Sequence, residues 1–216
     1  MSFEMEMEDY REDLKLKKYK KCLVTGGAGF IGSNLVDELI KDGHEVIVID
    51  DLSTGNKENI NPKAKFYHRS ISLMSEFSMF EDVDVVFHTA AKARVQPSID
   101  NPIDFNNINV SGTLNILQAC VDYGVNRFVY SSSSSVYGDV KQLPTTEEHS
   151  TNPMSPYALQ KLIGEQYCKL FSDLYDLETV CLRYFNVYGG GMSLEGAYKL
   201  VIPIFTEQRL NGKPMT

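Results

Sequence analysis

The chain has 216 residues, of which 43% are hydrophobic and 23% charged, and its formal net charge is −8. This length predicts one globular core with room for a small additional region. The acidic balance argues against nucleic acid as a partner, because phosphate binding requires a basic surface. No apolar run reaches about 18 residues, and the acidic start MSFEMEMEDYRED is unlike a signal or transit peptide. We therefore expect no membrane association and a cytoplasmic location.

Cysteine and histidine spacing gives no sign of a metal site. The four cysteines, Cys22, Cys120, Cys168 and Cys181, lie in apolar stretches without a CxxC pair, and the four histidines share no ligand spacing. We expect buried free thiols and no bound metal.

Short apolar runs alternate with longer helical patterns along most of the chain, which predicts βαβ units around a parallel sheet. Strands are expected over residues 21–25, 45–50, 64–68, 84–89, 127–132 and 179–184. Helices are expected over residues 31–41, 109–123 and 156–174, with a shorter one near 73–80. The predicted fold is a doubly wound parallel α/β sheet of the Rossmann type.

The chain divides into three predicted parts. Residues 1–20 are charged and form an N-terminal arm, either a surface helix or a disordered tail. Residues 21–190 form the nucleotide-binding domain. Residues 191–216 begin a substrate-binding region that we expect to be incomplete.

A glycine-rich turn joins the first strand to the first helix. Gly26, Gly29 and Gly32 in TGGAGFIGSNL form a GxxGxxG pattern, which lets a pyrophosphate approach the N-terminus of a helix. The second strand ends in Asp50, which can accept hydrogen bonds from the ribose hydroxyls of adenosine. A carboxylate there repels a 2′-phosphate, so the motif favours NAD over NADP.

Tyr157 and Lys161 stand four residues apart near the start of a predicted helix, so they share one helical face. A nearby cation lowers the pKa of a phenol and makes it a better base. The same spacing occurs in Tyr137 and Lys141, where Gly138 indicates a loop. The Tyr157–Lys161 pair is therefore informative only in the context of the other motifs.

The ordered motifs GGAGFIGSNL, DDLSTG, HTAA, NVSGTLNIL, SSSSVYG, SPYALQK and RYFNVYG cover almost everything after residue 20. Together they resemble the extended short-chain dehydrogenase/reductase family, within its NAD-dependent epimerase/dehydratase group. The resemblance implies a bound NAD and a nucleotide-sugar substrate, with UDP-glucose and UDP-N-acetylglucosamine 4-epimerases as the most similar members.

The residues that the resemblance assigns to the cofactor lie between Gly26 and Phe185, within several of these motifs and next to others. They are Gly26, Gly29, Phe30, Ile31, Gly32, Asp50, Asp51, Leu52, Ser53, Thr54, Gly55, Ser70, Ile71, Ala90, Ala91, Lys92, Ser131, Tyr157, Lys161 and Phe185. Ser70 stands where the family usually has an aspartate that contacts adenine, so this one contact is expected to be weaker.

The serine run over residues 131–135 helps to distinguish which reaction of the family this chain resembles. Similar 4,6-dehydratases carry an Asp-Glu pair where this chain has Ser134 and Ser135, and serine is a poor acid and a poor base. The hydroxyl residues instead resemble the 4-epimerase pattern, in which Ser133 binds the sugar 4-hydroxyl. Ser134, Ser135 and Asn186 are the other expected substrate contacts.

The resemblance implies a mechanism in which Ser133, Tyr157 and Lys161 are catalytic. Tyr157 removes the proton of the 4-hydroxyl while the C4 hydride passes to the nicotinamide, and hydride then returns to the other face of the keto sugar. Two alternatives stay open: another dehydratase or reductase of the family, and a truncated NAD-binding protein without catalysis. We expect a homodimer, and slow turnover by the 216-residue chain alone.

Overall fold

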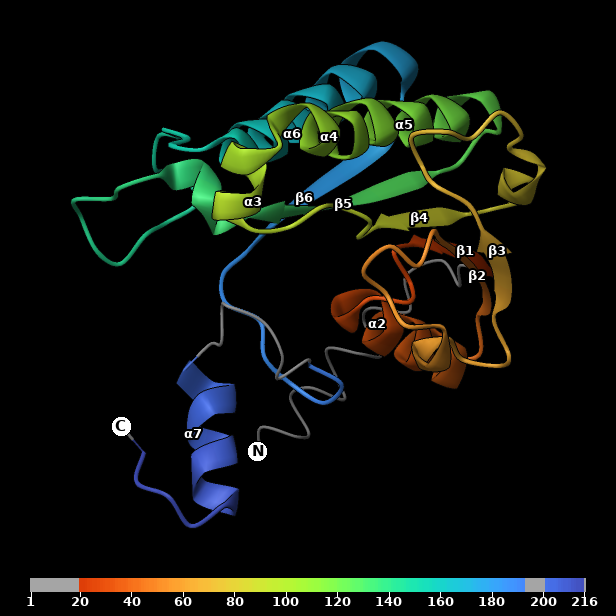
Figure 1. Cartoon of the computed structure of the whole chain (residues 1–216). Helices are drawn as coiled ribbons and strands as arrows, with labels where there is room; N and C mark the ends of the chain where they lie inside the picture. The colour runs from red at the N-terminus through yellow and green to blue at the C-terminus, as the bar shows by residue number, and fades with distance from the viewer. Residues whose placement is uncertain (1–19, 193–200, 216) are drawn as a thin grey trace, which may run out of the picture.

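A computed structural model describes residues 20–192 and 201–215 of the chain. Its centre is a six-stranded parallel sheet with the order β3-β2-β1-β4-β5-β6 (Figure 1). The strands are β1 (Lys21–Thr25), β2 (Glu45–Asp50), β3 (Lys65–His68), β4 (Val85–His88), β5 (Arg127–Ser133) and β6 (Glu178–Tyr184). The strand order reverses between β1 and β4, which is where a doubly wound sheet opens a crevice at its carboxyl edge.

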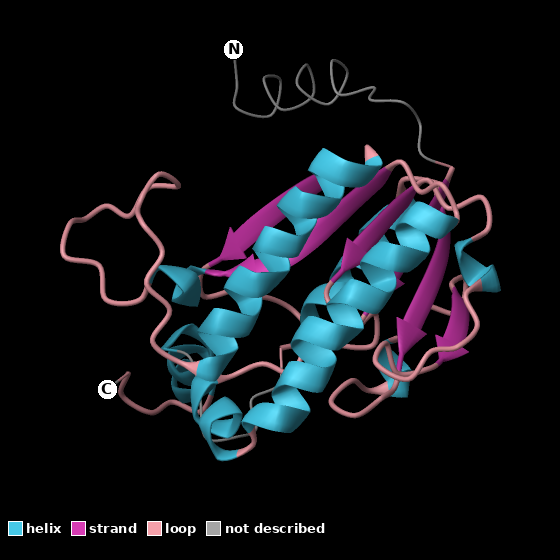
Figure 2. Cartoon of the chain, turned by 90° about the horizontal axis from the view of Figure 1, so that it is seen from above, coloured by secondary structure: helices cyan, strands magenta, loops and turns pink. Residues whose placement is uncertain are grey.

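Helices cover both faces of the sheet. The helix α2 (Phe30–Lys41) lies on one face, and α3 (Val95–Asp100), α4 (Pro102–Asn106), α5 (Thr113–Asp122) and α6 (Pro156–Tyr175) lie on the other. The two long helices α5 and α6 run side by side across the sheet (Figure 2). The helix α7 (Val201–Leu210) lies apart from these layers.

The inner strands β1, β2 and β4 are buried on both faces because their apolar side chains alternate between two cores. Leu23 and Ile47 point toward α5 and α6, where they join Phe128 and Ile116 in the larger core. The neighbouring strand residues Val24, Val46 and Val48 pack against Val36 of α2 in the smaller core. Continuous apolar runs such as VIVID therefore supply both layers from the same strand.

The sequence predicted all six strands and the three long helices, and no strand end is shifted by more than one residue. The helix expected near residues 73–80 is wrong, because only the single 3-10 turn η2 (Ser78–Phe80) forms there. Met79 and Phe80 are buried, whereas Leu73 is 84% exposed. The stretch therefore has no continuous apolar stripe that would hold a longer helix against the core.

The helix expected over residues 109–123 is longer and less regular than its sequence pattern indicated. It begins in α4, passes through the π-helical segment η3 (Asn107–Gly112) and continues as α5. The sequence analysis missed both short helices, α3 and α4. Turn-forming residues in QPSIDNP obscured their periodicity.

Two of the predicted parts of the chain lie wholly or partly outside the residues that the structure describes. The N-terminal arm and most of the stretch before α7 lie outside the described residues. Across the described residues, no helix is long and apolar enough to span a membrane, and no group of three metal-ligating side chains is found.

Candidate active site

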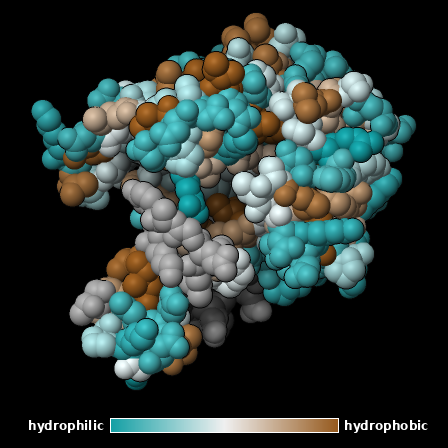
Figure 3. Space-filling view, viewed as in Figure 1, coloured by the Kyte–Doolittle hydropathy of each residue, from teal (hydrophilic) through white to brown (hydrophobic). Residues whose placement is uncertain are grey.

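The loops at the carboxyl edge of the sheet form two neighbouring pockets. One, the glycine-loop pocket, has a volume of about 230 Å³ and is lined by the turn after β1, the end of β2 and residues 89–92 after β4. The other, the tyrosine pocket, has a volume of about 570 Å³ and is lined by residues 94–97, the serine run and Tyr157. The segment after β4 thus contributes to both pockets, and Figure 3 shows a hollow in this face of the molecule.

The glycine-rich turn makes a backbone cradle that a side chain would fill. A Cβ atom on Gly32 would lie 2.2 Å from the carbonyl oxygen of Gly26, and one on Gly26 would lie 2.7 Å from the amide nitrogen of Ala90. Gly26 also has φ +73°, which favours glycine. The chain can therefore bring its backbone N–H groups close to a ligand at the start of α2, where the helix dipole favours an anion.

Asp50 joins this turn to the end of β2. Its Oδ2 accepts a hydrogen bond from the amide of Ala28 at 2.9 Å, and its Oδ1 accepts one from the amide of Leu52 at 2.8 Å. The carboxylate is 8% exposed and lines the glycine-loop pocket. Each oxygen keeps a second lone pair that can accept a hydrogen bond from a ligand hydroxyl.

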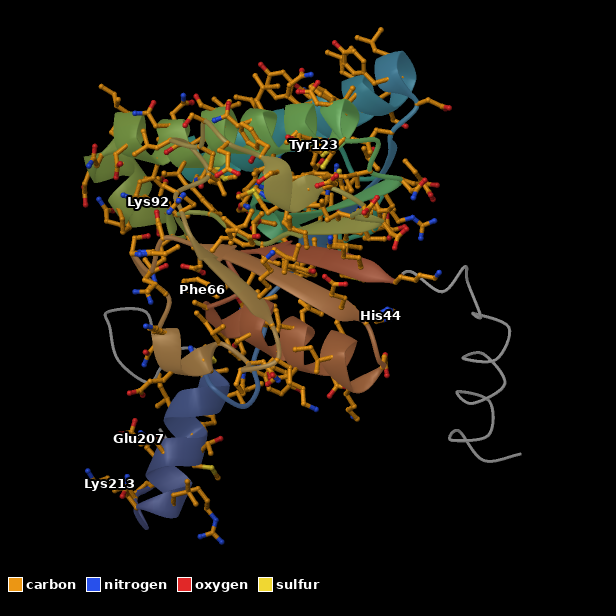
Figure 4. All side chains as sticks on the ribbon, turned by 90° about the vertical axis from the view of Figure 1, so that its right-hand side faces the viewer. His44, Phe66, Lys92, Tyr123, Glu207 and Lys213 are labelled. Atoms are coloured by element: carbon orange, nitrogen blue, oxygen red, sulfur yellow. The ribbon has the colours of Figure 1, made fainter. Side chains whose placement is uncertain are left out.

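Most of the residues predicted to bind the cofactor line the glycine-loop pocket. They are Gly26, Gly29, Phe30, Ile31, Gly32, Asp50, Asp51, Ser53, Thr54, Ile71, Ala90, Ala91 and Lys92. Lys92 forms an ion pair with Asp104 and lies at the opposite end of the sheet from His44 (Figure 4). Tyr157 and Phe185 line the tyrosine pocket instead.

Five of the predicted cofactor residues line neither pocket. The amide of Leu52 donates to Asp50, and a Cβ atom on Gly55 would lie 2.8 Å from the side chain of Ala28. The hydroxyl of Ser70 lies 3.2 Å from that of Ser72. These three residues are neighbours in sequence of residues that line the glycine-loop pocket. Ser131 and Lys161 lie beneath the tyrosine pocket, where Nζ of Lys161 donates to the carbonyl oxygen of Ser131 at 2.8 Å.

Two neighbouring serines of the serine run contact different residues of α6. Ser132 donates to Glu165, which also forms an ion pair with Arg183. Ser133 instead acts on the phenol of Tyr157, in the direction that lowers the pKa of Tyr157. The alternation of side chains along a strand explains why neighbouring serines have different partners.

The hydroxyl of Ser133 is oriented by its neighbour. The hydroxyl of Ser135 donates to Ser133 Oγ at 2.9 Å, and the amide of Ser135 lies 3.2 Å from the same atom. Because Ser133 Oγ accepts these bonds, its own proton is available for the phenol oxygen of Tyr157. Ser133, Ser134, Ser135 and Asn186, the predicted substrate contacts, all line the tyrosine pocket.

Tyr157 and Lys161 do share one face of α6, but their expected electrostatic relation is not found. Burial raises the pKa of Tyr157 above its usual value, and the hydrogen bond from Ser133 acts in the opposite direction. Burial lowers the pKa of Lys161 from 10.5 to about 8. The expectation that Lys161 lowers the Tyr157 pKa overlooked the loss of solvation that both groups undergo in the interior. Tyr137 and Lys141 lie at the end of the 3-10 turn η4 (Ser134–Tyr137) and in the following loop, as predicted.

Sequence reasoning missed several residues of the site. Ile49, Arg69, Thr89 and Ile108 line the glycine-loop pocket, and Arg94, Val95, Gln96, Pro97, Tyr137, Gly138, Val140 and Thr145 line the tyrosine pocket. Thr89 ends one predicted strand and Arg69 directly follows another, which was a usable signal. The residues after HTAA gave no such signal because their helix α3 was not recognised.

A buried polar network lies beneath both pockets. His88 is 1% exposed, and its Nδ1 lies 2.8 Å from Thr25 Oγ1 while its Nε2 lies 3.0 Å from Thr113 Oγ1. The hydroxyl of Thr113 donates to the carbonyl of Asn109, so Nε2 of His88 carries the proton and Nδ1 accepts one from Thr25. This network connects β1, β4 and the π-helical segment.

His88 makes the stability of the fold sensitive to acid. Burial, with a smaller contribution from Lys161, lowers the pKa of His88 from 6.5 to about 3. Only the unfolded chain takes up this proton between these pH values, so the free energy of unfolding falls as the pH drops below 6.5. Between pH 7 and pH 5 the expected loss from His88 is about 2 kcal/mol. Urea unfolding at the two pH values measures it.

The variant His88→Gln keeps one acceptor and one donor but does not titrate in this range. We expect it to lose about 2 kcal/mol less than the natural chain between pH 7 and pH 5. The variant His149→Gln, in the loop after β5, is the control and should follow the natural chain. Equal losses of unfolding free energy in all three proteins would contradict the lowered pKa of His88.

The sheet, the glycine-rich turn and the Ser133–Tyr157–Lys161 arrangement define a Rossmann-type protein of the short-chain dehydrogenase/reductase class. Comparison of the sequence with known protein families matches residues 22–216 to the NAD dependent epimerase/dehydratase family. The chain belongs to this family, as the motifs predicted.

Individual relatives share much of the chain. A UDP-glucose 4-epimerase of Mycolicibacterium smegmatis is 40% identical over 205 residues, which cover 89% of this chain and 64% of the relative. A UDP-N-acetylglucosamine 4-epimerase of Methanobrevibacter ruminantium, solved with UDP-N-acetylmuramic acid, is 40% identical with a TM-score of 0.85, covering 91% of this chain and 64% of that one.

A UDP-glucose 4-epimerase of Thermus thermophilus, solved with NAD, is 38% identical with a TM-score of 0.80 and covers 90% of this chain and 64% of that one. The chain therefore spans less than two thirds of the length of these relatives.

Proposed function

We propose that the protein is an NAD-dependent nucleotide-sugar 4-epimerase acting on a UDP-hexose or UDP-N-acetylhexosamine. The observation that carries the proposal is that Ser133 acts on the phenol of Tyr157 in a pocket whose described lining residues include no carboxylate. A dehydratase needs an acid to protonate its leaving hydroxyl, and Ser134 and Ser135 cannot supply one. A 4-epimerase needs only a group that exchanges one proton with the 4-hydroxyl.

The glycine-loop pocket fits NAD. The cradle at Gly26 and Gly32 would receive the pyrophosphate, and the free lone pairs of Asp50 would receive the ribose hydroxyls. Bound NAD would supply the acceptor and donor of hydride. The segment after β4 connects this pocket to the tyrosine pocket. A ligand in the glycine-loop pocket and a ligand in the tyrosine pocket would therefore meet near residues 92–94.

The side chains of the tyrosine pocket then have separate tasks. Tyr157 accepts the proton of the 4-hydroxyl during oxidation of C4 and returns it during reduction. Ser133 orients that hydroxyl and donates to the phenol, which favours the phenolate. Lys161 holds the carbonyl of Ser131 at the floor of the site and places a positive charge near it. Asn186 and Phe185 also line this pocket.

The function is tested by mixing the chain with NAD and UDP-glucose and following the sugar nucleotide by chromatography. We expect NAD to bind and UDP-galactose to accumulate, because Tyr157 and Ser133 line the pocket beside the cofactor site. Formation of a 6-deoxy-4-keto sugar would contradict the proposal in favour of a dehydratase. Bound NAD without any 4-epimer would support a non-catalytic protein.

We also propose that the protein forms a homodimer through the outer faces of α5 and α6. Exposed apolar side chains on α6 support this arrangement: Leu159 is 48% exposed, Leu170 46% and Leu174 62%. Two copies packing these faces together would remove them from water. Sedimentation of the chain as a monomer would contradict the proposal.

A cytoplasmic location and the absence of a nucleic-acid partner remain predictions.

A further inference from the structure

Arg94 has a backbone conformation that an arginine rarely adopts. Its φ is 91° and its ψ is 141°, close to a region that is used almost only by glycine. An L side chain in this conformation is destabilising, and such outliers occur where the surrounding structure enforces them. The residue lies in the segment after β4, directly before α3.

Hydrogen bonds on both sides of Arg94 enforce this conformation. On one side, the amide of Lys92 donates to Asn109 Oδ1 at 2.8 Å, and Asn109 Nδ2 donates back to the carbonyl of Lys92 at 2.9 Å. On the other side, Ser98 Oγ donates to the carbonyl of Val95 at 2.6 Å and accepts from the amide of Tyr157 at 3.1 Å. Asn109 and Ser98 are both buried. The segment is therefore fixed to α6 at Tyr157 itself.

The guanidinium of Arg94 is the charged side chain of the tyrosine pocket. The other described lining residues of this pocket are serines, tyrosines and other neutral or apolar residues. Arg94 is exposed and has no ion-pair or hydrogen-bond partner among the described residues, whereas Lys92, two residues earlier, is paired with Asp104. In a chain with a net charge of −8, an unpaired cation beside Ser133 and Tyr157 favours an anion in this pocket.

We propose that Arg94 is a specificity-determining residue that binds a carboxylate on the sugar ring of the substrate. This inference rests on the proposed function and narrows its substrate class to nucleotide sugars with an acidic hexose, such as a uronate. The planar guanidinium matches a carboxylate in a bidentate geometry, and a neutral hydroxymethyl group cannot form that pair. The fixed connection from Arg94 through Ser98 to Tyr157 would hold the carboxylate at a set distance from the reacting hydroxyl.

Binding of UDP-glucuronate and UDP-glucose to the NAD-loaded chain tests the proposal, because the two differ only at C6. We expect UDP-glucuronate to bind more tightly than UDP-glucose. Arg94→Gly should lower the affinity for UDP-glucuronate by about 10- to 100-fold and change the affinity for UDP-glucose less than threefold. Arg94→Lys should keep part of the preference. Because glycine tolerates the backbone conformation, Arg94→Gly should not lower the midpoint of thermal unfolding, which separates the effect from misfolding.

UDP alone is the third ligand in the experiment. If Arg94 bound the diphosphate, Arg94→Gly would lower the affinity for all three ligands by the same factor: UDP, UDP-glucose and UDP-glucuronate. That result would overturn the proposal. A natural chain that prefers UDP-glucose would also overturn it, while leaving the 4-epimerase proposal intact. Failure of both sugar nucleotides to bind would contradict the proposed function as well.

Discussion

Replacing Tyr157 by phenylalanine is expected to reduce 4-epimer formation by about 10²- to 10⁴-fold, the usual contribution of a general acid–base group. The phenol is the side chain that meets Ser133 in the pocket, and phenylalanine preserves the shape of the ring while removing the exchangeable proton. NAD affinity should stay within about threefold, since the cofactor cradle is formed by other elements. Initial rates with UDP-glucose and a binding titration with NAD measure the two effects.

Tyr167→Phe is the matched control for this experiment. It removes a phenol from the same helix, at a position that packs against the larger core rather than lining the pocket. Its rate should stay close to that of the natural chain. A Tyr157→Phe protein that retains a tenth or more of the natural rate would exclude Tyr157 as the catalytic base.

Replacing Gly32 by alanine should remove most of the NAD affinity, by at least about 100-fold. The added methyl group would lie 2.2 Å from the carbonyl oxygen of Gly26 and 2.9 Å from Cα of Gly27, so the start of α2 would have to move away from the turn. The backbone N–H groups would then no longer converge on the pyrophosphate. We also expect a loss of about 1–3 kcal/mol in the free energy of unfolding, which is typical of overpacking. Calorimetric NAD titration and urea unfolding measure these effects.

Gly43→Ala separates the loss of NAD affinity from a general loss of stability. Gly43 has φ +88°, and a Cβ atom there would meet no other atom within 4 Å. Alanine at this position should cost about 1 kcal/mol through backbone strain alone and should leave NAD affinity unchanged. If both glycine variants lowered NAD affinity equally, the close contact at Gly32 would not be the cause.

The sequence predicted the fold well because the signals for these elements are local. The inner strands are continuous apolar runs of the length expected for a parallel strand buried on both faces, as in VIVID of β2. The helix α6 begins at the Ser155-Pro156 pair, where Ser155 Oγ accepts from the amide of Ala158 at 3.1 Å. The helices α3 and α4 were missed because contacts with α6, rather than local periodicity, hold them in place.

The candidate site was predicted in part, for the same reason. Glycine spacing, Asp50 and the serine run are local patterns with direct chemical meaning, and the structure brings them to one edge of the sheet. The protonation behaviour of Tyr157 was not predictable from spacing, because it depends on how deeply α6 presses the phenol and Lys161 into the interior. Arg94 carries no motif at all.

By itself, the sequence determined that this protein is a Rossmann-type member of the epimerase/dehydratase family and which side chains stand at the carboxyl ends of its strands. Apolar periodicity and glycine spacing act over a few residues, so they can be read without a structure. Only the tertiary structure decided which of those side chains meet. Ser133 lies close to Tyr157, Ser132 binds Glu165, and Arg94 is connected to Tyr157 through Ser98. These contacts form because α6 packs on β5 and α3 packs on α6, which joins segments that are far apart in the chain.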